Sequence, residues 1–150
     1  MKNLFLILVL FLSLGAINAQ TSNEEIDYIQ AIFGMEKRAA VKEFIVLEDS
    51  FADAFWKNYD AYEVIRKAYG KERIVLLDKF TEKFDSMNDQ ESEVWMKAVL
   101  SLRDKNEKLI KVYYKKILKE CTSTVAMNFY QIESYILSGI RFQILENVPF

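Results

Sequence analysis

Apolar residues along most of the chain recur at steps of three and four, the repeat of an α-helix that buries one face. After Asp49 such positions are Phe51, Phe55, Tyr59, Tyr62, Ile65, Tyr69, Leu76, Phe80 and Phe84. No stretch sustains the alternation of two that a half-buried strand requires. Only four glycines and one proline occur in 150 residues, so the residues that form the turns of strand-and-turn folds are scarce. The pattern predicts an all-α fold.

The apolar stripes divide into four long predicted helices, over about residues 23–44, 50–84, 89–119 and 123–146. The connections between them are short, and short connections place consecutive helices antiparallel and adjacent. A helix of about 30 residues reaches roughly 45 Å. We therefore expect an elongated antiparallel bundle or hairpin array.

Polar residues at the predicted helix starts are suited to capping the free amides of the first turn. The expected caps are Ser22 with Glu25, Asp49 or Ser50, Asn88 with Glu91, and Thr122 or Ser123. Two glycines lie inside predicted helices: Gly34 is a candidate for a bend, and Gly70 for a kink or a break.

The first 19 residues have the layout of a secretory signal peptide. Lys2 supplies a positive charge, an apolar run extends from Leu4 to Ile17, and small residues end at Ala19. A run of about 14 residues is shorter than the roughly 20 that span a bilayer. We expect cleavage near Ala19, a periplasmic location without membrane attachment, and a single helical domain over residues 20–150. A retained N-terminal anchor is the alternative.

The charge and cysteine content limit the partners. The net charge of −2 becomes −3 once Lys2 is removed, which argues against nucleic acid because such partners need a basic face. Cys121 is the single cysteine, so no internal disulfide is available. We interpret it as a buried or half-buried thiol, with a bridge between two chains or a reactive or metal-binding thiol as alternatives.

The sequence contains no histidine, which removes the commonest general base and most zinc sites. Glycine-rich phosphate loops and nucleophile motifs are also missing from it. The carboxylates are spread at helical surface spacing among lysines, which is typical of a solvated face. We predict a non-enzymatic protein without catalytic, cofactor or metal sites.

Two sets of residues are candidates for function. The aromatic band of the second predicted helix is either core or an apolar surface for clients; it contains Phe51, Phe55, Trp56, Tyr59 and Tyr62. Glu133 and Arg141 interrupt the apolar stripe of the last helix. They either pair with another helix and fix the register of the bundle, or they point outward.

Two segments resemble small exported helical bacterial proteins of the Spy/CpxP or sensor-of-sigma-factor type. The first is Leu47–Phe51 followed by Phe55–Glu63, and the second is Phe129–Ile136 with the ending Asn147–Phe150. The LTxxQ motif of the Spy type is not matched, although Met87–Glu91 lies at a comparable helix start.

The resemblance implies a fold of long helices and hairpins. In the best-known relatives it also implies a cradle-like antiparallel dimer that shelters unfolded clients without ATP, or a sensor of envelope stress. The expected partners are other proteins or a second copy of the chain. The alternatives from the sequence are a structural, oligomerising envelope protein and a carrier of small molecules or lipid.

Overall fold

The computed structural model describes the backbone of residues 23–147 and the side chains of residues 34–146. Within this part of the chain the elements are four α-helices and one 3₁₀ turn, without strands: α2 (Asn23–Phe44), α3 (Asp49–Lys83), η1 (Phe84–Ser86), α4 (Asp89–Glu120) and α5 (Ser123–Asn147). The all-α prediction is confirmed, and each helix boundary lies within one residue of its expected place. The predicted signal peptide lies outside the described residues.

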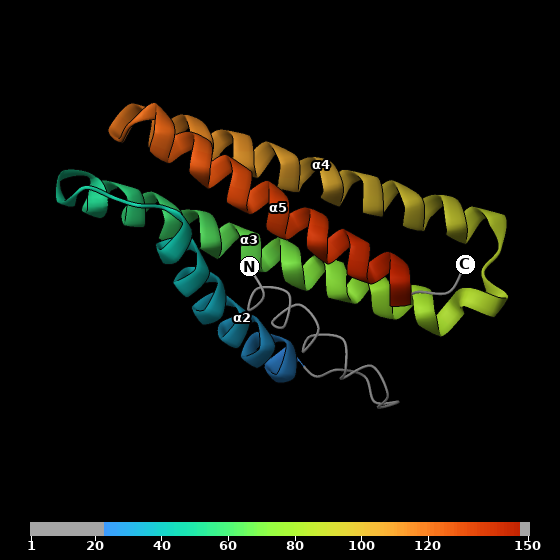
Figure 1. The fold of residues 1–150 in the computed structure, drawn as a ribbon. Coiled ribbons are helices and arrows are strands. Elements are labelled where there is room, and N and C mark those ends of the chain that lie inside the picture. The colour runs from blue at the N-terminus through green and yellow to red at the C-terminus, as the bar shows by residue number, and fades with distance from the viewer. Residues whose placement is uncertain (1–22, 148–150) are drawn as a thin grey trace.

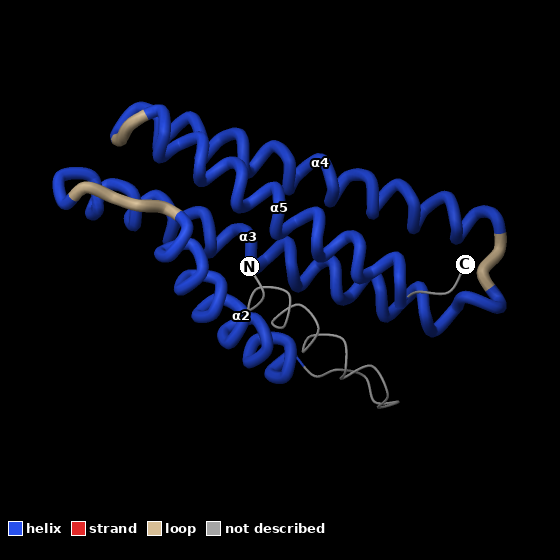
Figure 2. The backbone as a smooth tube through the Cα atoms, viewed as in Figure 1, coloured by secondary structure: helices blue, strands red, loops and turns tan. Residues whose placement is uncertain are grey.

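The helices form an elongated antiparallel array (Figure 1). Helices α3 and α4 make a long hairpin through η1, and α5 returns beside α4. Helix α2 lies at an angle to the other three and contacts α3 and α5. Figure 2 shows that short loops join the helices, which is why each packs against its neighbour in sequence.

The start of α4 has the predicted capping box. The Asn88 side chain accepts a hydrogen bond from the Glu91 backbone N–H at 3.0 Å, and the Asn88 backbone N–H donates to Glu91 Oε2 at 3.2 Å. At the start of α5, Thr122 Oγ1 accepts from the Val125 backbone N–H at 3.2 Å. These side chains satisfy amide donors that a helix start leaves free.

The predicted cap of α3 by Asp49 or Ser50 is wrong. The helix already begins at Asp49, and the preceding Glu48 makes no side-chain capping bond. The cap expected at Ser22 lies outside the described residues. Neither glycine breaks a helix, because α2 continues through Gly34 and α3 through Gly70.

All four helices contribute to one core. Its buried apolar side chains are Val41 and Ile45 from α2, Phe55, Tyr59 and Tyr62 from α3, Leu109, Ile110, Tyr113 and Ile117 from α4, and Val125, Ala126, Phe129, Ile132, Ile136 and Leu137 from α5. Towards η1 the α3–α4 hairpin continues with a smaller contact, in which the rings of Phe80 and Trp95 stack 4.4 Å apart.

Candidate functional site

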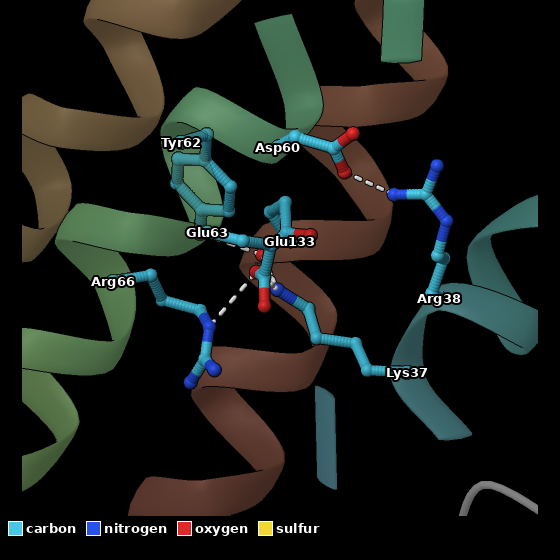
Figure 3. A network of polar contacts seen from close by, with 7 residues as sticks. All are labelled: Lys37, Arg38, Asp60, Tyr62, Glu63, Arg66 and Glu133. Carbon is cyan, nitrogen blue, oxygen red and sulfur yellow. Dashed lines mark hydrogen bonds and ion pairs between the residues drawn. The ribbon is translucent and has the colours of Figure 1, made fainter. Parts of the chain in front are cut away.

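A lysine is buried where α2 crosses α3 and α5. Lys37 is 1% exposed, and its Nζ lies 2.5 Å from Glu63 Oε1 on α3 and 2.7 Å from Glu133 Oε2 on α5 (Figure 3). Lys37 precedes the core residues Val41 and Ile45 by four and eight positions, so the helical repeat puts all three on the buried face of α2. One ammonium group therefore joins three helices.

Two further side chains complete this cluster. Arg66, one turn after Glu63 on α3, donates from Nε to Glu63 Oε1 at 2.8 Å. The Tyr62 hydroxyl donates to Glu133 Oε2 at 2.6 Å. We call Lys37, Tyr62, Glu63, Arg66 and Glu133 the buried polar cluster; its two cations balance its two carboxylates.

The electrostatics of the cluster keep Glu63 ionised. Burial alone would raise the pKa of this carboxyl, but the charges of Lys37 and Arg66 outweigh burial and leave the pKa below its ordinary value. Burial raises the pKa of the Tyr62 hydroxyl well above its usual range, and the charge of Glu133 raises it further. Tyr62 is therefore a neutral hydrogen-bond donor.

Three buried oxygens of this region have no hydrogen-bond partner among the described residues. They are Tyr59 Oη, Glu63 Oε2 and Glu133 Oε1. The remaining charged atoms are turned towards one another, so the cluster suits holding α2 in place better than exchanging protons with a substrate. No group of three or more histidine, cysteine or acidic side chains in the described part of the chain is arranged to hold a metal ion.

The aromatic band divides between core and rim. Phe55, Tyr59 and Tyr62 are at most 2% exposed, so these three side chains are core and offer no surface to a client. Phe51 and Trp56 keep partial exposure. Trp56 is covered in part by the guanidinium of Arg38, which lies 4.2 Å from the ring centroid and pairs with Asp60 (Figure 3).

Both polar residues singled out on the last helix pair with other helices. Glu133 is 2% exposed and contacts Lys37 and Tyr62, so the interpretation that it points outward is wrong. Arg141 donates from Nη2 to Glu107 Oε1 on α4 at 3.0 Å and is partly exposed.

Cys121 is half-buried beside α3. Its thiol lies 3.9 Å from the Phe51 carbonyl oxygen. Burial raises the pKa of the thiol, and the charge of Glu120 adds to the rise, so the group is a poor nucleophile in this arrangement.

Neither Lys37 nor Glu63 was selected as a candidate from the sequence. The spacing of Lys37 from Val41 and Ile45 marks it as a charge on a buried face. The corresponding feature on α3 is that an acidic residue, Glu63, directly follows the buried Tyr62. Their partnership depends on how α2 lies across the bundle, which spacing within one helix does not show.

The outer face of α5 differs from the rest of the surface. From Ser123 to Leu145 its exposed residues are all uncharged: Ser123, Thr124, Met127, Gln131, Tyr135, Ser138, Phe142 and Leu145. We call Met127, Gln131, Tyr135, Ser138, Phe142 and Leu145 the α5 outer face. Successive members are three or four residues apart, so they form one stripe about 27 Å long.

A comparison of the chain with protein-family models, curated proteins and solved structures finds no match. None of the helices in residues 23–147 combines the length and apolar character needed to cross a membrane.

Proposed function

We propose that this is a non-enzymatic helical protein of the periplasm that binds other proteins, in a chaperone-like or envelope-stress role, through the α5 outer face. The partner contributes an apolar, uncharged segment, such as an exposed stretch of an unfolded chain. The observation that carries the proposal is the exposure of four large side chains on one stripe: Met127 is 48% exposed, Tyr135 56%, Phe142 54% and Leu145 60%.

The contrast with the neighbouring helices supports this choice. The exposed positions of α4 include Lys108, Lys111 and Lys115, and those of α3 include Lys57 and Asp60, as expected for solvated faces. A stripe that is largely apolar and carries no charge is typical of a surface that a partner covers. Charged residues are depleted in the centre of protein interfaces, where aromatic residues and methionine are enriched.

The buried face of α5 explains why its opposite face stays exposed. Ile132, Ile136 and Leu137 are buried in the core, and Glu133 is held by Lys37 and Tyr62. The helix therefore has no freedom to rotate its apolar stripe inward without exposing core residues and separating the buried ion pair.

An aggregation-suppression assay tests the proposal. The purified protein, added in increasing amounts to a thermally unfolding client, should delay light scattering. Phe142→Lys should remove most of the protection, because it replaces a large exposed apolar side chain of the stripe with a charge. Val64→Lys on α3 is the matched control, since Val64 is 71% exposed and lies outside the stripe. Equal protection by both variants would exclude the α5 outer face.

Self-assembly through the same face is the alternative function, that of a structural envelope protein. Sedimentation of the wild type and Phe142→Lys separates the two: a stable oligomer that Phe142→Lys dissociates, without client protection by either, favours the structural function.

The periplasmic location has its own test, which is whether the N-terminal sequence of the exported protein begins at Gln20.

A further inference from the structure

A small cleft opens between α3, α4 and α5 beside the buried polar cluster. Four residues on one face of α3 line it, together with Asn106 of α4 and Glu133 and three apolar side chains of α5; the α3 residues are Tyr62, Arg66, Gly70 and Arg73, and the apolar residues are Ile136, Leu137 and Ile140. The volume of about 30 Å³ accommodates one or two water-sized groups. The buried polar cluster uses neither Arg73 nor Asn106.

The charges around the cleft leave one cation in excess. Arg66 and Lys37 balance Glu63 and Glu133, and Arg141 on α5 pairs with a carboxylate of α4. Arg73 is half-buried and makes no hydrogen bond or ion pair with any described residue. A guanidinium stays charged at every physiological pH, and a cation removed from water is costly unless an anion is close.

The surroundings of Arg73 make this lack of a partner more pronounced. Burial lowers the pKa of its guanidinium, and the nearby positive charges of Arg141 and Arg66 lower it further. Arg141 and Arg66 thus add positive charge near Arg73, which favours an anion in the cleft.

The cleft also indicates which anion fits. Glu133, which lines the cleft from α5, has a buried oxygen without a partner among the described residues, and its charge repels a dianion such as phosphate more strongly than a monoanion. Asn106 uses one amide hydrogen on the Leu102 carbonyl oxygen and has a second to donate. Ile136 and Ile140 form an apolar wall.

We infer that this cleft binds the carboxylate group of a small monoanionic ligand with a short alkyl body, held by the guanidinium of Arg73. Arginine pairs with a carboxylate through two parallel hydrogen bonds, and the two oxygens are the water-sized groups that the cleft accommodates. The ligand is either a free short-chain carboxylic acid or the terminal carboxylate of a molecule with a longer alkyl chain.

The experiment measures the melting temperature of the purified protein in sodium butyrate, and butyrate binding by titration calorimetry. Sodium chloride at equal ionic strength is the control. Butyrate should raise the melting temperature in a saturable way, because a ligand that binds only the folded state stabilises it. Arg73→Gln should weaken butyrate binding by about tenfold or more. Arg103→Gln, which removes an exposed arginine of α4, should leave binding unchanged.

Gly70→Leu provides a second test that keeps every charge. Because Gly70 lines the cleft, the new side chain should fill it and remove butyrate binding even if Arg73→Gln does not fold. Stronger binding by octanoate than by butyrate indicates a longer chain as the source, and equal binding indicates a free short acid. Equal stabilisation by chloride, by 1-butanol or by phosphate, or undiminished binding in Gly70→Leu, would overturn the inference.

Discussion

Lys37 occupies a position where the repeat of α2 would place an apolar side chain, and two carboxylates from different helices compensate it. Such buried pairs seldom add much stability compared with an apolar core, because removing the charges from water offsets their attraction. Removing one partner is strongly destabilising, since it leaves the other charges buried and uncompensated. At the scale of single residues, the cluster therefore makes the position of α2 specific.

The first prediction concerns the central cation. Lys37→Met keeps the length of the apolar stem but leaves Glu63 and Glu133 without their shared ammonium group. The free energy of unfolding should fall by about 3–5 kcal/mol, measured by urea denaturation at pH 7. Lys42→Met, at an exposed position on the same helix, should change it by less than about 0.5 kcal/mol. Equal stability of the two variants would refute the role given to Lys37.

Two neighbouring tyrosines allow a matched comparison. The Tyr62 hydroxyl donates to the carboxylate of Glu133, so Tyr62→Phe should cost about 1.5–3 kcal/mol. The Tyr59 hydroxyl is buried without a partner among the described residues, so Tyr59→Phe should be neutral or stabilising. Chemical denaturation of both variants checks the order, and a larger loss for Tyr59→Phe would contradict these contacts.

The shifted pKa of Glu63 predicts how stability depends on pH. Its folded-state pKa lies below the ordinary value of 4.5, so the unfolded chain binds more protons once the pH approaches that value. The stabilisation is complete above about pH 4.5 and disappears as the pH falls through the folded-state pKa. Urea denaturation between pH 6 and 3 should give a shallower loss for Glu63→Gln than for wild type. Glu93→Gln, at an exposed position, should keep the wild-type slope; a wild-type slope in Glu63→Gln would contradict the assignment.

Sequence reasoning identified one acid of this cluster, Glu133, and a second polar contact of α5 outside it. Glu133 and Arg141 were selected because they interrupt an apolar stripe, and the structure pairs both with other helices. The aromatic band remained undecided between core and surface because helical spacing defines a face without showing what covers it. Lys37 and Glu63 were missed as partners because they are 26 positions apart, and their contact depends on the packing of α2.

At the scale of elements, helix extents were the most predictable property. Apolar repeats and the shortage of glycine and proline located each helix, and the Asn88–Glu91 capping box was readable as a pattern. The start of α3 was less predictable, because Asp49 and Ser50 are consecutive residues of types that commonly cap helices. Gly70 did not break α3, since packing against α4 continues on both sides of it.

The two starts give a prediction about local stability. Asn88→Ala removes the side-chain acceptor of the Glu91 backbone N–H, leaves the bond that the backbone N–H of residue 88 donates to Glu91, and should cost about 1 kcal/mol. Glu48→Ala should change stability by less than about 0.5 kcal/mol, because Glu48 makes no capping bond. Urea denaturation of the two variants measures the difference in their free energies of unfolding. An equal loss of stability in both would show that the cap of α4 does not stabilise the protein.

At the scale of the whole molecule, the buried polar cluster and the α5 outer face belong to one arrangement. The cluster fixes α2 on α3 and anchors the inner side of α5, while the stripe on its outer side remains uncovered by the described residues. Three of the α3 aromatics that were candidates for a client surface, Phe55, Tyr59 and Tyr62, belong to the core that supports this stripe. The α5 outer face is therefore the surface that we propose a partner covers.

Site-specific photo-crosslinking to a defined unfolding client tests this central claim most directly. A photoreactive residue replaces Tyr135 or Phe142 in the stripe, or, as matched controls, Val64 on α3 or Lys111 on α4, all exposed. The account predicts client adducts from positions 135 and 142 and few from 64 and 111. Adducts at all four positions alike, or only at 64 and 111, would contradict the claim that the α5 outer face binds other proteins.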